Sequence, residues 1–184
     1  MTKKDDNKKY EFGLNSFGDI ALDDNGKRLS DAESIRQVVK EAVLADKLGI
    51  DVIGLGEHHR EDFAISSPET VLAAIASVTK RIKLSSAVTV LSSDDPVRVY
   101  QRFATLDAVS SGRAQIILGR GSFTESYPLF DIICVTTTNY LKRKLSCFRN
   151  FAPKIPLPGM ALCVHRLRMR MCIQKPNLVS CLHT

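Results

Sequence analysis

The sequence lacks several features that would assign it quickly to a class of protein. No apolar run reaches the length of about 20 residues that a membrane-spanning helix needs. The first ten residues are charged and lack the apolar core of a secretory signal. No Gly-x-Gly-x-x-Gly motif follows the first expected strand, so the pattern of a Rossmann dinucleotide site is missing. We therefore expect a soluble, cytoplasmic protein without a membrane partner.

Acidic residues are absent from the last part of the chain. Residues 1–131 contain 17 Lys and Arg and 20 Asp and Glu, whereas residues 132–184 contain 9 Lys and Arg and no acidic residue. All five cysteines also lie after residue 131. The two compositions predict a folded domain at 1–130 and a basic, cysteine-containing, poorly ordered tail at 131–184.

The first 130 residues alternate between strand-like and helix-like patterns. Apolar segments predict strands at residues 11–14, 52–55, 82–91 and 114–118, and residues 15–29 are expected to form a polar loop. Amphipathic patterns predict helices at 30–49, 66–78 and 94–109. Strand and helix repeated with short connections indicate an α/β fold with parallel strands and right-handed crossovers. A doubly wound sheet and the first half of an eight-stranded barrel both fit.

The helix ends carry recognisable signals. Ser30 and Glu33 have the spacing of a capping box, in which each side chain accepts a hydrogen bond from the other residue's backbone N–H. Gly49 is expected to close the first helix in the left-handed conformation. Pro68 suits the first turn of the second helix, where no N–H is needed. That helix is expected to bury Val71, Leu72, Ile75 and Val78.

The strand at 52–55 runs directly into Glu57, His58 and His59. An apolar run this short, after a helix that ends at Gly49, is typical of a strand buried on both faces. Parallel sheets and barrels place their chemistry at the carboxyl ends of such strands, which makes the three residues candidate catalytic residues. Their spacing alone also fits a solvated loop, or one histidine buried in the core.

The last strand of the domain is followed by Gly119, Arg120, Gly121 and Ser122. A glycine-flanked arginine at the end of a strand can bind a phosphate through backbone N–H groups and its guanidinium. The same four residues fit a plain turn, so the motif by itself does not establish a phosphate site.

Three segments together resemble the bacterial luciferase-like family of flavin-dependent monooxygenases: GLGEHHREDFAISSPE at 54–69, SSAVTVLSSDDPVRVYQRFATLDAVSSGRA at 85–114 and ILGRGSFTESYPLF at 117–130. The resemblance extends from about residue 10 to residue 130. It implies a TIM (β/α)8 barrel, of which this chain holds the first four βα units. It also implies FMN as the cofactor, and oxidation of a small organic substrate with reduced flavin and O2.

The resemblance assigns roles to the residues of both motifs. His58 matches the active-site histidine beside the flavin, with Glu57 and His59 orienting it or lining the pocket. An imidazole suits this place because it titrates near neutral pH and can donate or accept a proton. Ala87 and Val88 match the place of a non-prolyl cis peptide under the flavin ring.

The resemblance also places Arg120 near the flavin phosphate. Its neighbours Gly119, Gly121 and Ser122 complete the expected cofactor-binding loop. Bacterial luciferase itself has a cysteine where this chain has Gly119, so no thiol chemistry is expected here, and no metal is expected either. The implied partners are the small-molecule substrate, O2 and a flavin reductase, or NAD(P)H where the protein reduces the flavin itself. Homodimers are frequent in the family.

Three explanations fit the change of composition at residue 131. The positive charges suit phosphates or anionic lipid. The cysteines and histidines of the tail are metal-ligand types, although their spacing matches no familiar zinc site. The third explanation is a frameshift: one base restored after the codon of Phe130 allows a stop-free rereading that contains LFEEKVELF and RPPLENAYVYPKAQLGQLP. The first segment has a helical period and the second resembles the next section of the family, so we infer a single-base frameshift.

Two main hypotheses for function follow. The chain is an FMN-dependent oxidoreductase whose activity is impaired by the loss of half the barrel, or it is a non-catalytic half-barrel fragment. A basic nucleic-acid-binding module is the least favoured alternative, because the frameshift makes the basicity of the tail accidental and leaves no nucleic-acid partner. If the chain ends as written, strands one and four are expected to present open edges, since a barrel avoids edges only by closing.

Overall fold

A parallel sheet forms the centre of the computed structural model, which describes residues 10–133, 137–151 and 168–171. The strand order is β1-β2-β3-β5-β4, and β6 pairs with β5. All of these pairs are parallel. The strands are β1 (Gly13–Ser16), β2 (Val52–Leu55), β3 (Lys83–Ser86), β4 (Thr89–Val90), β5 (Ala114–Gly119) and β6 (Arg168–Met171).

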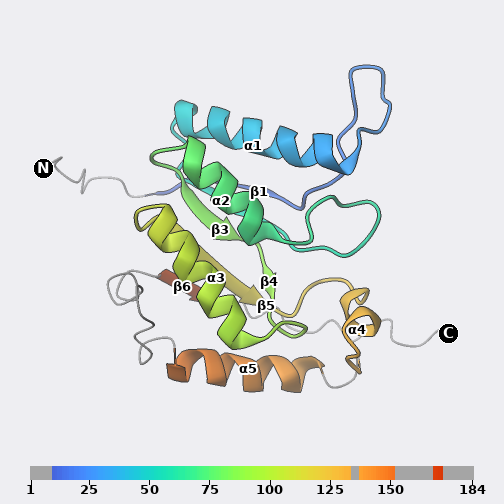
Figure 1. The fold of residues 1–184 in the computed structure, drawn as a ribbon, viewed down its shortest axis with the longest axis vertical. Coiled ribbons are helices and arrows are strands. Elements are labelled where there is room, and N and C mark those ends of the chain that lie inside the picture. Colours follow the sequence, from blue (N-terminus) through green and yellow to red (C-terminus); the bar gives the residue numbers. More distant parts are fainter. Residues whose placement is uncertain (1–9, 134–136, 152–167, 172–184) are drawn as a thin grey trace, which may run out of the picture.

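The helices lie along one side of this sheet (Figure 1). They are α1 (Asp31–Leu48), α2 (Pro68–Val78), α3 (Pro96–Val109), the short α4 (Ser126–Leu129) and α5 (Thr137–Phe151). The order of the first strands across the sheet follows their order in the chain, and successive right-handed crossovers then place every connecting helix on the same face. A doubly wound sheet has helices on both faces, so the arrangement is that of a partial (β/α)8 barrel.

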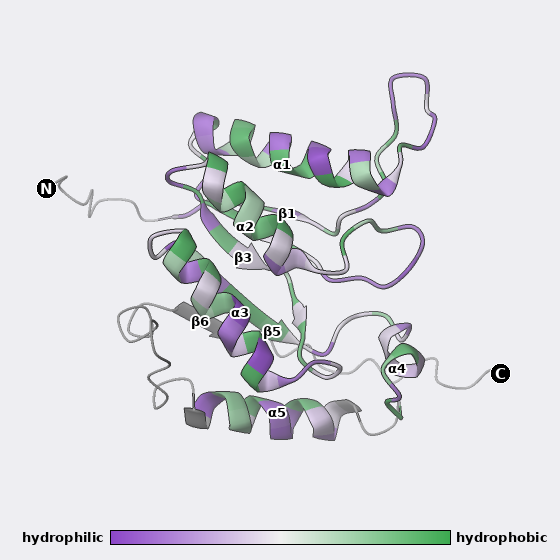
Figure 2. Ribbon diagram, in the orientation of Figure 1, coloured by the Kyte–Doolittle hydropathy of each residue, from purple (hydrophilic) through white to green (hydrophobic). Residues whose placement is uncertain are grey.

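The core lies between the sheet and these helices. Figure 2 shows hydrophobic residues concentrated in β5 and α2, whereas α1 and α5 carry many hydrophilic residues. The largest fully buried apolar side chains include Leu55, Leu72, Ile75, Leu84, Phe103 and Ile116. Among the described residues, no helix combines the length and apolar character needed to cross a membrane.

The predicted helix ends are confirmed. The backbone N–H of Glu33 donates to Ser30 Oγ at 3.3 Å, and the N–H of Ser30 donates to Glu33 Oε2 at 3.0 Å, which completes the capping box. Gly49 closes α1 with φ 88°. The Asp95 carboxylate caps α3 by accepting from the N–H groups of residues 97 and 98, both at 2.9 Å.

Two predictions of local structure are wrong. The first strand is Gly13–Ser16 and not 11–14, because it pairs residue by residue with β2, from Gly13 opposite Val52 to Ser16 opposite Leu55. Val78 is 54% exposed, although helical spacing placed it in the buried stripe of α2. The stripe continues instead through the buried Thr79, whose hydroxyl donates to the Ile75 carbonyl at 2.7 Å.

The third expected strand is divided into β3 and β4. A cis peptide bond joins Ala87 and Val88 between them, at the position that the family resemblance implied. Ser85 pairs with Gln115, and Thr89 pairs with Leu118. Between these two pairs, the three residues 86–88 lie opposite only the two residues 116–117 of β5. The hydroxyl of Ser86 fills the gap in the ladder, because it donates to the Ile117 carbonyl at 3.0 Å and accepts from the Ile117 N–H at 3.1 Å.

A helix of the basic segment, α5, packs on the domain. Phe148 of α5 is buried and contacts Tyr100 of α3 edge-on, with ring centroids 6.1 Å apart. Leu141 and Leu145 lie on the same face of α5, at helical spacing from Phe148, and pack against the core. The poorly ordered tail expected from residue 131 onward stays a prediction; within it the structure describes α5 and β6. Because β6 pairs with β5, the predicted open edge of strand four is also not found.

The remainder of that segment lies outside the described residues. It holds Cys134, Cys163, Cys172 and Cys181, while Cys147 is a free, exposed thiol on α5. The described residues contain no group of His, Cys, Asp and Glu suited to a metal ion. The other cysteines and the histidines of the tail lie outside the residues that the structure describes, so the hypothesis of a metal site there stays a prediction.

The amino end of the sheet is tied together by Arg113. Its guanidinium donates to the carbonyls of Ala76, Thr79, Ile82 and Ser110, and to the hydroxyl of Thr79, at 2.8 to 3.1 Å. These bonds join the end of α2 to the start of β3 and β5. The carboxyl ends of the strands, where parallel sheets place their chemistry, lie at the opposite end.

Candidate active site

Three loops at the carboxyl ends of the strands enclose His58. The imidazole stacks on Phe63 with ring centroids 4.2 Å apart, and it meets Phe17 and Phe123 edge-on at 5.6 and 5.3 Å. Phe17 follows β1, Phe63 follows β2, and Phe123 follows β5. Only 9% of His58 is exposed. The histidine is therefore held by apolar rings at the mouth of the partial barrel, and the solvated-loop interpretation is wrong.

The backbone around His58 is fixed by the same loops. Its N–H donates to the Ile65 carbonyl at 3.0 Å, and the N–H of Ala64 donates to the Gly18 carbonyl at 2.7 Å. A Cβ atom added to Gly56 would lie 3.1 Å from His58 Nε2. Glycine at this position therefore lets the imidazole lie close over the end of β2.

A carboxylate faces the other ring nitrogen of His58. Glu125 Oε1 lies 4.0 Å from Nδ1, and the side chains of His58 and Glu125 are 10% and 19% exposed. Burial lowers the pKa of His58, while the carboxylates of Glu125, Asp19 and Glu57 oppose that shift and His59 adds to it. The lowered pKa favours a neutral imidazole at neutral pH, and a neutral imidazole can accept a proton.

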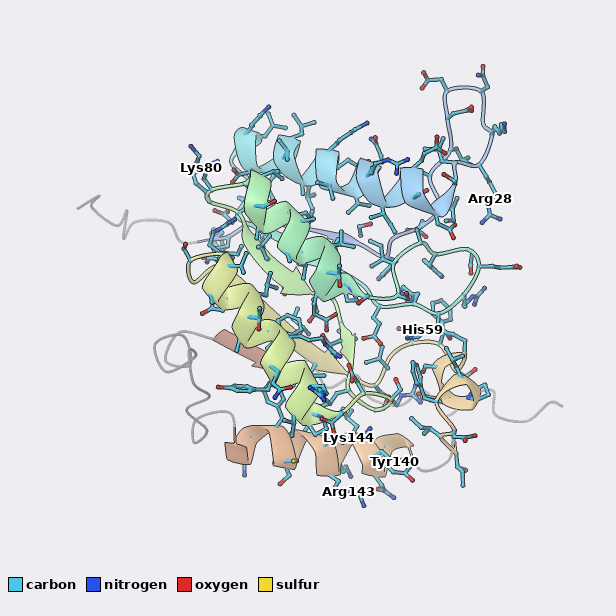
Figure 3. All side chains as sticks on the ribbon, in the orientation of Figure 1. Arg28, His59, Lys80, Tyr140, Arg143 and Lys144 are labelled. Carbon is cyan, nitrogen blue, oxygen red and sulfur yellow. The ribbon has the colours of Figure 1, made fainter. Side chains whose placement is uncertain are left out.

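His59 has different neighbours from His58. Its Nε2 lies 3.2 Å from Glu57 Oε1, and its ring meets Phe130 edge-on at 5.2 Å. The other oxygen of Glu57 accepts from the Val90 N–H at 2.9 Å. The hydrogen bond to Glu57 raises the pKa of His59 despite burial. Figure 3 shows His59 on the side of the sheet where α4 lies.

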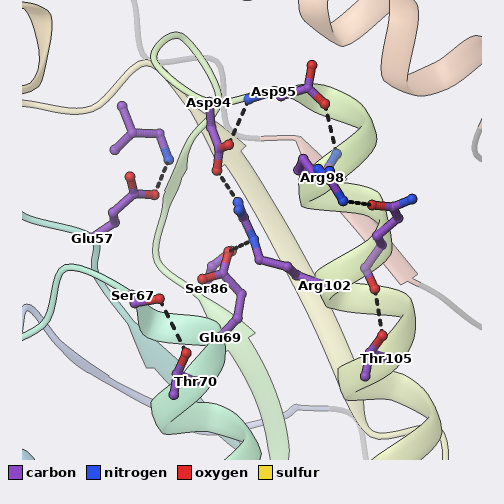
Figure 4. Close-up of polar contacts among 12 residues, drawn as sticks. Glu57, Ser67, Glu69, Thr70, Ser86, Asp94, Asp95, Arg98, Arg102 and Thr105 are labelled. Atoms are coloured by element: carbon purple, nitrogen blue, oxygen red, sulfur yellow. Dashed lines mark hydrogen bonds and ion pairs between the residues drawn. The ribbon is translucent and has the colours of Figure 1, made fainter. Parts of the chain in front are cut away.

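A polar cavity of about 180 Å³ lies beside this pair. At its centre Arg102 of α3 forms an ion pair with Asp94, and its Nε lies 3.4 Å from Glu69 Oε1 (Figure 4). Burial raises the pKa of Glu69, with Arg102 opposing the shift and Glu57 adding to it. The lining residues are Glu57, His59, Ser66, Ser67, Glu69, Ser93, Asp94, Arg102 and Phe130.

The structure thus separates the three predicted catalytic residues. Among the described residues, the hydrogen bonds of Glu57 go to His59 and Val90, and neither Glu57 nor His59 bonds to His58. Glu57 and His59 line the polar cavity, whereas His58 does not, and their expected roles beside His58 stay predictions. His58 instead lies among phenylalanines with Glu125, a residue that the sequence analysis did not select.

The residues expected to bind the cofactor do come together. A Cβ atom on Gly119 would lie 2.8 Å from Val88 Cγ2, and one on Gly121 would lie 3.1 Å from Val90 Cγ1. The Ala87 N–H donates to the Leu55 carbonyl at 2.7 Å, which ties the cis peptide to the end of β2. The cis peptide, the end of β5 and the end of β2 therefore form one surface at the barrel mouth.

Arg120 has a guanidinium available for a ligand. Its carbonyl accepts from Ser92 Oγ at 2.7 Å, but its half-buried side chain forms no hydrogen bond or ion pair with another residue that the structure describes. Gly121 follows with φ 85°, and Ser122 is exposed. An arginine beside a positive-φ glycine and an exposed serine has the composition of a phosphate-binding turn.

The fold and this site define a class of protein: a parallel α/β barrel architecture with its candidate chemistry at the carboxyl ends of the strands. The luciferase-like monooxygenase family model matches residues 15–133. The chain belongs to the luciferase-like monooxygenase family.

Individual relatives agree with this family. The chain is 28% identical over 115 residues to the alkanal monooxygenase alpha chain of Photorhabdus laumondii, covering 62% of this chain and 32% of the relative. It is 30% identical over 106 residues to the oxygenase component of the flavin-dependent trigonelline monooxygenase of Acinetobacter baylyi, covering 55% of this chain and 29% of the relative. The chain thus spans about a third of the length of these curated relatives.

Solved structures show the same fold. The monooxygenase RslO1 from Streptomyces bottropensis superposes with a TM-score of 0.70 at 23% identity, covering 80% of this chain and 44% of that one. The oxygenating constituent of 3,6-diketocamphane monooxygenase from Pseudomonas putida, in complex with FMN, gives 0.69 at 23% identity, with 80% and 40% covered. An F420-dependent secondary alcohol dehydrogenase gives 0.63 at 17% identity, with 81% and 43% covered. The described fold therefore corresponds to somewhat less than half of these barrels.

Proposed function

We propose that this chain carries the histidine-bearing half of an FMN-dependent monooxygenase site, which oxidises a small organic substrate with reduced flavin and O2. The observation that carries the proposal is the buried His58 at the mouth of the barrel, with a lowered pKa and an acid facing Nδ1. In a site of this kind His58 accepts or donates a proton beside the flavin. Membership of the luciferase-like family supports the class of reaction.

FMN is the cofactor that we propose for this site. Arg120 and Ser122 would hold its phosphate, and the surface around Ala87, Val88 and Gly119 would support its ring system. Reduced FMN supplies the electrons for the reaction with O2. A flavin is also named for the trigonelline relative, at 30% identity, whereas F420 is named for two solved neighbours at 17% and 18% identity. These comparisons favour a flavin over F420.

A separate flavin reductase, drawing on NAD(P)H, is the proposed source of reduced flavin. The trigonelline relative is described as an oxygenase component, a term that implies a second component. No Gly-x-Gly-x-x-Gly motif follows β1, so the pattern of a Rossmann dinucleotide site is missing, and direct reduction by NAD(P)H is the alternative source. Homodimer formation stays a prediction from the family.

A non-catalytic half-barrel fragment is the second candidate. The observation that favours it is that the family match ends at residue 133, two residues beyond the point where acidic residues disappear from the chain. We propose that a single-base frameshift near codon 131 causes this change and impairs flavin binding. Sequencing the gene across codons 128–135 tests the frameshift: a confirmed, unaltered reading frame contradicts it.

The function is tested by comparing the 184-residue chain with the product of the gene carrying the restored base. We expect the restored protein to quench FMN fluorescence on binding and to oxidise substrate with reduced FMN and O2. The chain as written should bind FMN more weakly than micromolar, because half of the cofactor site is missing. Arg120→Ala should weaken FMN binding in the restored protein, whereas the exposed Arg36→Ala is the control.

The two candidates give opposite results in this experiment. Micromolar FMN binding and turnover by the 184-residue chain would contradict impairment. A restored protein that binds no FMN would contradict the proposed function. A restored His58→Ala variant should keep FMN binding and lose turnover, which separates the role of the histidine from that of the phosphate site.

A further inference from the structure

The acid beside His58 comes from the loop between β5 and α4. Glu125 Oε1 lies 4.0 Å from His58 Nδ1, and both side chains are largely buried. This distance is too long for a direct hydrogen bond but within the range of an ion pair. A bridging water or a small rotation of the Glu125 side chain would close it. The pair therefore has the arrangement of a histidine with an orienting carboxylate.

The imidazole has little freedom to turn away from Glu125. Phe63 covers one face at 4.2 Å, with 23° between the ring planes, while Phe17 and Phe123 bound its edges. The nitrogen opposite Nδ1, Nε2, lies close over Gly56, where even a Cβ atom would approach to 3.1 Å. Because the ring is held in this way, Nδ1 faces Glu125 and Nε2 faces the end of β2.

Glu125 also has a second, unused oxygen. Oε2 is buried and has no hydrogen-bond partner among the described residues. A buried carboxylate oxygen without a donor is costly, because its lost hydration is not replaced. The other oxygen, Oε1, faces Nδ1 of His58 at 4.0 Å, so the negative charge of the carboxylate favours a proton on Nδ1.

Among the described charged groups near His58, Glu125 is the one within ion-pair distance of its ring. Asp19 lies on the loop after β1, Glu57 bonds to His59 and Val90, and His59 points to the polar cavity. The guanidinium of Arg60 lies over the Phe123 ring, 4.7 Å from its centroid. Among these groups, Glu125 makes the largest favourable electrostatic contribution to the protonated His58.

We propose that Glu125 is a positioning residue that keeps the proton of neutral His58 on Nδ1. The nitrogen over the end of β2, Nε2, is then the proton acceptor. The hydrogen-bond partner of one ring nitrogen sets which nitrogen carries the proton, and this choice decides the direction in which a histidine can act as a base. The catalytic meaning of the proposal rests on the proposed function of His58, but the tautomer itself does not.

Long-range ¹H–¹⁵N NMR spectra of the 184-residue chain test the proposal, because they distinguish the two tautomers of neutral histidine. The chain contains four histidines, and His58→Gln identifies the signals of His58. We expect His58 to carry its proton on Nδ1 in the wild type. Glu125→Gln should lower the pKa of His58 further, and Glu125→Ala should in addition populate the Nε2–H tautomer.

Glu57→Gln is the matched control, because it removes a carboxylate that bonds to the neighbouring His59. It should mainly lower the pKa of His59, whereas the Glu125 variants should mainly affect His58. Thermal melting shows which variants fold, and Glu125→Asp replaces any that do not, with an expected partial loss of the Nδ1–H preference. An Nε2–H tautomer in the wild type, or an unchanged His58 titration in Glu125→Gln, would overturn the proposal.

The restored protein gives a second readout. There, Glu125→Gln should lower kcat several-fold and shift its pH profile, with little change in KM, because the residue does not touch the substrate. Failure of the proposed function is recognised separately. A wild-type protein that shows the Nδ1–H tautomer but no flavin-dependent turnover would refute the function and leave the inference about Glu125 intact.

Discussion

Adjacent histidines at the end of β2 have opposite electrostatic environments. Burial among three phenylalanines lowers the pKa of His58, whereas the hydrogen bond to Glu57 raises the pKa of His59. The difference arises because the two side chains have different neighbours: phenylalanines and Glu125 around His58, and Glu57 and Phe130 beside His59. The two residues therefore suit different tasks: His58 can accept a proton at neutral pH, and His59 is held in place by a charged partner.

Replacing Glu57 should lower the free energy of unfolding, mainly at low pH. The pKa of His59 is higher in the folded state than its ordinary value of about 6.5. Protonated His59 therefore stabilises the folded state fully at pH values below about 6.5, and this stabilisation is lost as the pH rises through the folded-state pKa. Glu57→Gln removes the contribution. The difference in unfolding free energy between wild type and variant should therefore be larger at pH 6 than at pH 9, as measured by urea denaturation.

The exposed Glu61→Gln is the control for that experiment, since Glu61 does not line the polar cavity that Glu57 and His59 share. It should change stability equally little at both pH values. Part of the loss in Glu57→Gln is expected to persist at pH 9, because the Val90 N–H also bonds to Glu57. A difference that is independent of pH would contradict the role assigned to the Glu57–His59 pair.

At the scale of elements, the contact of β5 with the break between β3 and β4 shapes the cofactor surface. Gly119 ends β5, and a Cβ atom there would lie 2.8 Å from Val88 Cγ2 and 3.2 Å from Val88 Cβ. Valine is stiff about its first side-chain torsion, so the contact is not relieved by a simple rotation. The absence of a side chain at Gly119 therefore allows β5 to approach the cis peptide closely.

Gly119→Ala should destabilise the protein by about 1–3 kcal/mol, the usual cost of an added methyl group in a packed region. Gly13→Ala on β1 is the control, because the nearest atom to its added Cβ lies at an ordinary 3.4 Å. Urea denaturation of both variants measures the two effects. Equal stability changes would show that the approach of β5 to Val88 is not tight.

At the scale of the whole molecule, the described sheet does not close, and β1 and β6 are its outer strands. β5 pairs with β6, but β1 pairs only with β2 among the described residues. Tyr10, Phe12 and Leu14, on or beside β1, are 66%, 68% and 51% exposed. An edge strand with unpaired backbone groups and exposed apolar side chains is a template for association.

Phe12→Lys should therefore reduce self-association of the 184-residue chain, because a charge on an edge strand opposes edge-to-edge pairing. Analytical ultracentrifugation over a range of concentrations measures the effect. Val109→Lys on α3 is the control, since Val109 is 56% exposed and α3 packs against α2, α5 and β5. A chain that is monomeric at every concentration, or an equal effect of both substitutions, would contradict this role of β1.

Much of the order of elements follows from the sequence alone. The ends of α1 are set by Ser30, Glu33 and Gly49, and the spacing of apolar residues identifies the helices and most strands. These signals are local, because capping bonds and helical periodicity involve residues a few positions apart. The family resemblance added the position of the cis peptide and the choice of a barrel over a doubly wound sheet.

Only the tertiary structure decided which side chains meet. Glu125 and His58 are 67 positions apart, and they face each other because β5 and β2 lie in one sheet, separated by β3. The same folding turns His59 toward Phe130, exposes Val78 and places Phe148 against Tyr100. A sequence fixes local conformation through neighbouring residues, but contacts between strand ends depend on how the whole sheet is assembled.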